Sequence, residues 1–154
     1  MRNALTQYKK TATSTNSRGQ ILLMLYDGAI RALEQARVAI EQRRPDLKGA
    51  RLSRAHAVIS ELDVTLDHEA APEMCQNLSA LYRFMLDQIT DANRRNQAEP
   101  LAVVIEILTD LRQSWALAVE QVEGHAPTSE GHPAPSEEPS SWASAPRAAL
   151  SIVG

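Results

Sequence analysis

The 154-residue sequence has only one cysteine, Cys75, so it cannot form an intramolecular disulfide. A lone thiol in a helical pattern is more typical of the reducing cytosol than of a secreted protein. Cys75 has no neighbour in the sequence that would lower its pKa and make it a reactive thiolate. We therefore interpret it as a small buried side chain.

Long apolar runs are also missing. No segment approaches the roughly 18 consecutive apolar residues of a membrane-spanning helix. Residues 1–17 are polar, with scattered lysines and threonines, and contain no apolar stretch like the core of a signal peptide. We therefore expect a soluble, cytoplasmic protein with no stable insertion into a membrane.

Basic residues are not in excess, because 16 Lys and Arg stand against 19 Asp and Glu, with a formal net charge of -3. Proteins that bind nucleic acid usually carry a basic patch or stripe, so no nucleic-acid partner is expected. The length suits one domain, since about 100 ordered residues can bury an adequate core without disulfides or metals.

Motifs of enzyme chemistry are missing as well. A di-iron bundle needs Glu-x-x-His pairs on facing helices, and no histidine here has a glutamate three residues before it. Asp67, His68 and Glu69 crowd potential metal ligands, but consecutive helical residues point in different directions, which favours a solvated helix end. No glycine-rich phosphate loop is present. We expect no catalytic residue, no metal and no cofactor.

His56 supports the one enzyme-like alternative, a histidine phosphotransfer bundle. Domains of that class expose one histidine on a helix and usually follow it with a lysine and a glycine that open access to the ring. Here Ala57, Val58 and Ile59 follow instead. A histidine on the flank of a helix, without chemistry, is the favoured interpretation.

What the sequence does contain is apolar residues at alternating three- and four-residue spacing, in four segments. The spacing predicts helices over about 17–43, 46–67, 72–96 and 100–124. Ser17 and Gln20 form a capping box for the first helix. Pro72 and Pro100 suit first helical turns. Because the connections are short, we predict an all-α fold, an antiparallel up-down four-helix bundle.

The two ends of the chain lack this period. Residues 1–16 are predicted to form a flexible segment, with Leu5 and Tyr8 as its only large anchors. Residues 125–154 hold five of the eight prolines and many Ser and Ala, so we predict a disordered tail. Ala148 to Val153 are more apolar than the rest of the tail, and an unstructured end is favoured there over a docking motif. The predicted divisions are therefore 1–16, 17–124 and 125–154.

Several apolar stripes are wider than a helix with one packed face requires. The stretch Gln20 to Ile30 is the clearest case. A broad apolar arc is usual for a helix with two neighbours in a bundle, whereas the sharper hypothesis is a groove for an incoming partner helix. The residues that widen the stripes are Leu23, Tyr26 and Ile30 in the first helix, Tyr82 and Leu86 in the third, and Val103 and Ile107 in the fourth.

Several pieces of the sequence, taken in order, resemble the flagellin export chaperones, the FliS family. They are Tyr8, Gln20-Ile-Leu-Leu-Met-Leu-Tyr-Asp-Gly-Ala-Ile30, Ile59-Ser-Glu-Leu62 with Leu66-Asp67, Asn77-Leu-Ser-Ala-Leu-Tyr82, Ala92-Asn93 and Leu111-Arg-Gln-Ser-Trp115. The resemblance implies a small cytoplasmic helical bundle that binds the C-terminal segment of new flagellin. It also implies that flagellin is kept unpolymerised until the flagellar type III export apparatus takes it.

The resemblance further implies that the N-terminal segment lies near the binding surface, which gives Tyr8 a role. A helical adaptor for a partner outside the flagellum is the remaining alternative. The predicted partner-binding residues are Tyr8, Leu23, Tyr26, Ile30, Tyr82, Leu86, Val103 and Ile107.

Overall fold

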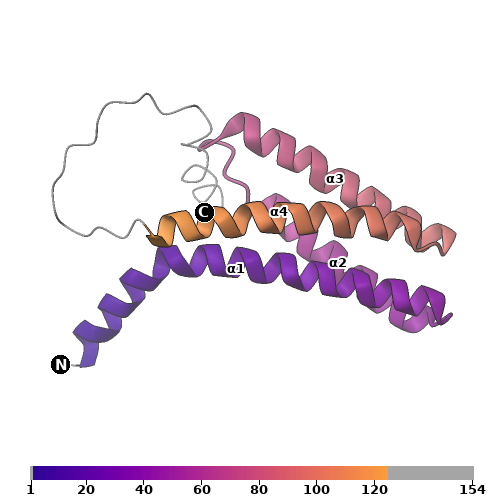
Figure 1. Ribbon diagram of the computed structural model, residues 1–154, viewed down its shortest axis with the longest axis horizontal. Coiled ribbons are helices and arrows are strands. Elements are labelled where there is room, and N and C mark those ends of the chain that lie inside the picture. The colour runs from indigo at the N-terminus through magenta and orange to yellow at the C-terminus, as the bar shows by residue number, and fades with distance from the viewer. Residues whose placement is uncertain (1, 125–154) are drawn as a thin grey trace.

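The computed structural model describes residues 2–124, with side chains described from Arg18 onward. This part of the chain forms four α-helices: α1 (Arg2–Glu41), α2 (Pro45–Val64), α3 (Pro72–Arg95) and α4 (Glu99–Gly124). Consecutive helices run in opposite directions and pack on one another, and α4 packs back on α1 to close the bundle (Figure 1). The predicted all-α four-helix fold is confirmed.

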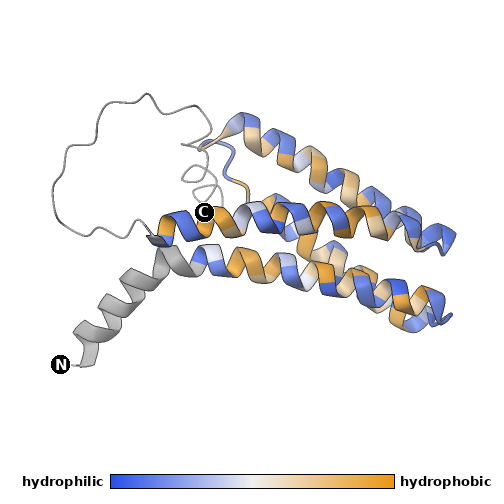
Figure 2. Ribbon diagram, in the orientation of Figure 1, coloured by the Kyte–Doolittle hydropathy of each residue, from blue (hydrophilic) through white to orange (hydrophobic). Residues whose placement is uncertain are grey.

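The core consists of the apolar stripes that the spacing predicts. In α2 and the residues just after it, the predicted seam is buried throughout, with Leu52, Ala55, Ile59, Leu62 and Leu66 each exposing 8% or less of their surface. Apolar and polar residues alternate along the coloured part of all four helices (Figure 2). None of the described helices is long and apolar enough to cross a membrane.

One predicted boundary is wrong, because α1 begins at Arg2 and not at Ser17. A capping box is a local pattern that can also lie within a longer helix. Residues 2–16 contain no glycine and no proline, so nothing in them breaks a helix. The flexibility of residues 1–16 stays a prediction, and the tail of residues 125–154 lies outside the described part.

Helix α1 ends in a Schellman motif at an arginine. The backbone N–H of Arg44 donates to the carbonyl of Ala39 at 2.8 Å, and that of Arg43 donates to Ile40 at 3.1 Å. Arg43 therefore adopts a left-handed conformation with φ of 55°. Glycine is the usual residue at this position because it has no Cβ to collide with the backbone.

Replacing Arg43 with glycine should raise the free energy of unfolding by about 0.5–1 kcal/mol. Relief of the left-handed strain, about 1–2 kcal/mol, is partly offset by the larger backbone entropy that glycine loses on folding. Urea unfolding followed by circular dichroism measures the change. The control Glu41→Gly, at the last helical residue, should instead lower stability by about 1 kcal/mol. Equal losses in the two variants would contradict the prediction.

Candidate functional site

Three aromatic side chains form a hydrogen-bonded cluster inside the bundle. The hydroxyl oxygens of Tyr26 on α1 and Tyr82 on α3 are 2.5 Å apart, and the indole Nε1 of Trp115 on α4 donates to Tyr26 at 3.0 Å. The three residues expose 0%, 1% and 5% of their surfaces. Because α1 packs on α2 and α4, the bond to α3 crosses the bundle diagonally. We call these three residues the aromatic cluster.

The aromatic cluster changes how two predicted partner-binding residues are understood. Tyr26 and Tyr82 were expected in a groove, yet neither side chain reaches the surface of this structure. Any effect of theirs on a partner would act through the packing of α1 against α3 and α4. Burial raises the pKa of both phenols, and for Tyr82 the neighbouring Tyr26 raises it further, so both hydroxyls stay neutral.

This pKa shift predicts a loss of stability at alkaline pH. In the unfolded chain both phenols ionise near the ordinary value of 10.0, whereas in the folded chain they keep their protons. Above pH 10 the unfolded state binds fewer protons, so the free energy of unfolding should fall by up to about 1.4 kcal/mol per pH unit for each tyrosine. Below pH 10 the two groups contribute no pH dependence.

Urea unfolding at pH 8, 10 and 11 checks this expectation. The variant with both Tyr26→Phe and Tyr82→Phe lacks the two phenols, so its stability should decline less steeply above pH 10. Parallel curves for the two proteins would rule out the buried phenols as the cause.

Two other predicted residues, Leu23 and Ile30, lie on α1. Leu23 is buried and Ile30 is half-buried against the core. The exposed edges of α1 and α4 are joined by an ion pair. Arg112 of α4 donates two hydrogen bonds to the carboxylate of Asp27 on α1, at 2.5 and 3.1 Å. The bond to Asp27 raises the pKa of Arg112, which stays charged. The edges of α1 and α4 are therefore more polar than a groove for an apolar helix would be.

The most exposed apolar residues on α4 share one face. Val103 exposes 43% and Leu117 exposes 61% of its surface, while Ile107 is half-buried against the core. At 100° per residue, Ile107 and Leu117 each lie within about 40° of Val103 around the helix. We call these three residues the α4 face. Val103 and Ile107 were predicted from the sequence, but Leu117 was missed.

Leu86 does not join the α4 face. It lies on α3 and is half-buried against the core. Thr90, one turn later on the same helix, lines a small pocket together with Gly49 and His56 of α2. Leu86 is therefore on the side of α3 that meets α2. Phe84, on α3 and 43% exposed, was also missed by the sequence analysis. Its exposure on a helix next to α4 could not be read from one helical wheel.

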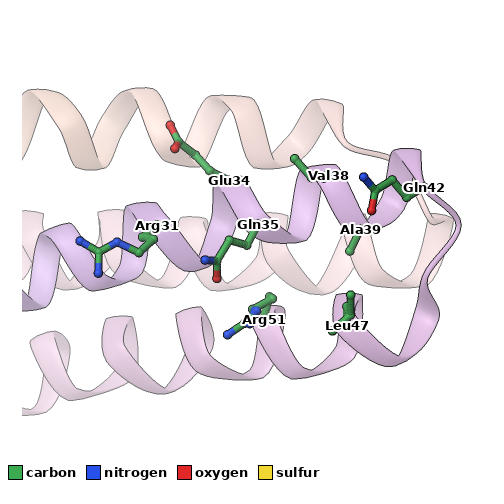
Figure 3. Close-up of a pocket in the computed structure, with 8 residues that line it drawn as sticks. All are labelled: Arg31, Glu34, Gln35, Val38, Ala39, Gln42, Leu47 and Arg51. Atoms are coloured by element: carbon green, nitrogen blue, oxygen red, sulfur yellow. The ribbon is translucent and has the colours of Figure 1, made fainter.

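A second surface is a groove between α1 and α2, of about 500 Å³. Val38, Ala39 and Leu47 supply its apolar part, and Arg31 and Arg51 extend along its rim (Figure 3). Glu34, Gln35 and Gln42 complete the lining. We call this surface the α1–α2 groove. None of its residues was predicted as partner-binding.

The residues that were weighed as phosphotransfer or metal-binding candidates make ordinary structural contacts. His56 is exposed, and its Nδ1 lies 3.5 Å from the hydroxyl of Ser60, at the limit of a hydrogen bond. The carboxylate of Asp67 accepts the backbone N–H groups of Glu69 and Ala70 in the turn before α3. Among the described residues no cluster of His, Cys, Asp and Glu could hold a metal ion. Nothing in this geometry favours the phosphotransfer alternative.

The interpretation of Cys75 as a small buried side chain is confirmed. Cys75 has no exposed surface, and its thiol donates to the backbone carbonyl of Asp67 at 3.2 Å. Burial, and then the charge of Asp67, raise the pKa of the thiol. Because the thiolate is the reactive form, Cys75 should be inert in the folded protein.

Comparison with known proteins shows what this sequence is similar to. Residues 1–122 match the family described as Flagellar protein FliS. The flagellar secretion chaperone FliS of Vibrio cholerae is 38% identical over 119 residues, which are 75% of this chain and 88% of the relative. The Bacillus subtilis chaperone of the same name is 31% identical over 120 residues, 78% of this chain and 89% of the relative. That of Salmonella typhimurium is 36% identical over 107 residues, 69% and 79% of the two chains.

Proposed function

Because the chain belongs to the FliS family of flagellar proteins, we propose that it is a cytoplasmic export chaperone that binds the C-terminal segment of flagellin. Binding would cover the apolar surface that flagellin uses to polymerise. The chaperone would then support delivery of flagellin to the flagellar type III export apparatus. This function needs no catalysis, which fits relatives that are named as chaperones.

The α4 face is the observation on this structure that best supports the proposal. An amphipathic helix binds by placing apolar anchors, spaced three or four residues apart, against apolar positions of a partner. Val103 and Ile107 are four residues apart, and Leu117 follows on the same face about three turns later, beyond the polar Asp110 and Ser114. Isolated exposed apolar residues are common on proteins, but a row of them on one face indicates a contact surface.

The magnitudes are sufficient for such a contact. Full burial of one large apolar side chain contributes roughly 1.5–3 kcal/mol. A segment that folds on binding loses about 2–5 kcal/mol in ordering. Two or three anchors on the α4 face, with the exposed Phe84 of α3, are therefore of the size needed to offset this ordering.

Titration calorimetry with the C-terminal segment of flagellin from the same organism tests the proposal. Binding should show a negative heat-capacity change, because apolar surface is buried. A flagellin variant without this segment is the matched control and should give no heat. Absence of heat with the full segment at tens of micromolar would refute the proposal and favour a helical adaptor for another partner.

The N-terminal segment has a proposed role in the same binding. Residues 2–16 form the first turns of α1 in this structure. We propose that residues 1–16, with Tyr8, also fold back over part of the surface in the free protein and move aside for flagellin. Deletion of residues 2–12 should then change the dissociation constant. An unchanged value would exclude the gate but not the chaperone function.

A further inference from the structure

The described residues are unevenly charged along the bundle axis. Residues 31–54, where α1 runs into α2, include seven basic and three acidic side chains, an excess of four positive charges. Residues 61–73, at the opposite end, include five acidic side chains and no Lys or Arg. Glu120 and Glu123, in the last turns of α4, add to the acidic end, because α2 and α4 run in the same direction and their last turns lie at the same end of the bundle (Figure 1).

The α1–α2 groove lies within the basic part of the bundle. Its rim carries Arg31 and Arg51, and its apolar wall includes Val38 and Leu47, which expose 47% and 36% of their surfaces (Figure 3). This combination suits a segment that has acidic residues and apolar residues close together. A purely apolar helix would leave the two guanidinium groups without compensation.

The tail of residues 125–154 has the complementary composition. It includes Glu130, Glu137 and Glu138 against the single basic residue Arg147, an excess of two negative charges. Its residues 148–153 are mostly apolar. The family match ends at residue 122, so the family does not account for the tail. The tail follows Gly124, the last residue of α4, at the end of the bundle where the acidic residues lie.

The tail is long enough to reach the groove. Helix α4 has 26 residues and is therefore about 39 Å long. The 14 residues from His125 to Glu138 span at most about 46 Å when extended. Glu137 and Glu138 can thus reach the basic half, and residues 148–153 follow with length to spare.

We propose that the tail of residues 125–154 docks in the α1–α2 groove of its own chain. Its glutamates lie against Arg31 and Arg51, and its apolar residues 148–153 lie against Val38 and Leu47. The contact is weak per residue, because exposed ion pairs are screened by salt. A tether gives an effective concentration of about 1 mM, so an intrinsic Kd of about 0.1 mM leaves roughly nine molecules in ten docked. The proposal does not depend on flagellin binding.

A nitroxide on the tail tests the proposal in the full chain. The label is attached to Ser141→Cys, and the inert Cys75 stays unlabelled. Amide signals of Val38, Leu47 and Arg51 should lose more than half of their intensity relative to the reduced nitroxide, while those of Phe84 and Val103 keep theirs. Raising NaCl from about 50 to 500 mM should restore the groove signals, because the glutamate contacts are screened.

Charge reversal gives the matched comparison. Arg31→Glu with Arg51→Glu should remove the signal loss at the groove, whereas Arg83→Glu on α3 should leave it in place. All three positions are exposed, so the fold should persist, and circular dichroism checks this. If the double variant fails to fold, the NaCl titration of the groove signals in the protein with both arginines still tests whether the tail docks there.

Three outcomes would overturn the proposal. The first is no loss at the groove, or loss only at residues near Gly124. The second is loss that 500 mM NaCl does not reduce. The third is loss in isotope-labelled, nitroxide-free chains mixed with unlabelled, nitroxide-bearing chains, which would assign the groove to the tail of a second copy.

Discussion

The variant Tyr26→Asp should lose the cooperatively folded bundle. A carboxylate at this position would be buried without a cationic partner, and the missing ring would leave a cavity beside Tyr82 and Trp115. Each effect is destabilising, and together they should reduce the free energy of unfolding by more than about 4 kcal/mol. Domains are typically stable by only about 5–15 kcal/mol. Thermal unfolding followed by circular dichroism should show a broad or absent transition.

Two conservative variants make the prediction specific to the aromatic cluster. Tyr26→Phe removes the acceptor of Trp115 and the partner of Tyr82, so it should reduce stability by about 1–3 kcal/mol. Tyr82→Phe removes only the bond to Tyr26 and should have the smaller effect, about 1 kcal/mol. If Tyr82→Phe is as destabilising as Tyr26→Phe, the bond from Trp115 contributes nothing.

The second large effect is expected on flagellin binding. The double variant with Val103→Asp and Leu117→Asp should raise the dissociation constant for the C-terminal flagellin segment by about 100-fold, which corresponds to about 2.7 kcal/mol. Its stability should change little, because Val103 and Leu117 are 43% and 61% exposed. Titration calorimetry measures the affinity.

The matched control is Val64→Asp, which makes the same change at a residue of α2 that is 79% exposed. It should leave the affinity within about twofold of the original, because Val64 is on another helix. If Val64→Asp reduces the affinity as much as the α4 double variant, the added negative charge, and not the α4 face, determines binding.

The helices were predictable because the apolar seams repeat locally. Leu52, Ala55, Ile59 and Leu62 are buried as their spacing requires. A helical wheel placed Tyr26 at the widened edge of the apolar stripe of α1, where it was predicted to bind a partner. It could not give the depth of burial. That depth depends on partners 56 and 89 positions away in the sequence, Tyr82 and Trp115.

Two other features needed the structure for different reasons. Arg43 holds a left-handed conformation that its residue type disfavours, so no local rule predicts the Schellman motif there. The α1–α2 groove depends on how α1 and α2 are placed side by side, which brings Val38 next to Leu47. Exposure of Leu117 likewise depends on which side of α4 the other helices leave uncovered.

The aromatic cluster also means that different interactions position the helices inside the bundle, hydrogen bonds for α1, α3 and α4 and apolar packing for α2. Hydrogen bonds have preferred directions, and those of Tyr26, Tyr82 and Trp115 fix the rotation of α1, α3 and α4 about their own axes. The buried residues of α2 are all apolar, and apolar contacts have no preferred direction. Helix α2 is therefore positioned in the interior by the shape of its side chains alone, and the hydrogen bonds from Lys48 to the backbone of Asn93 and the side chain of Asn96 are its directional contacts with the end of α3.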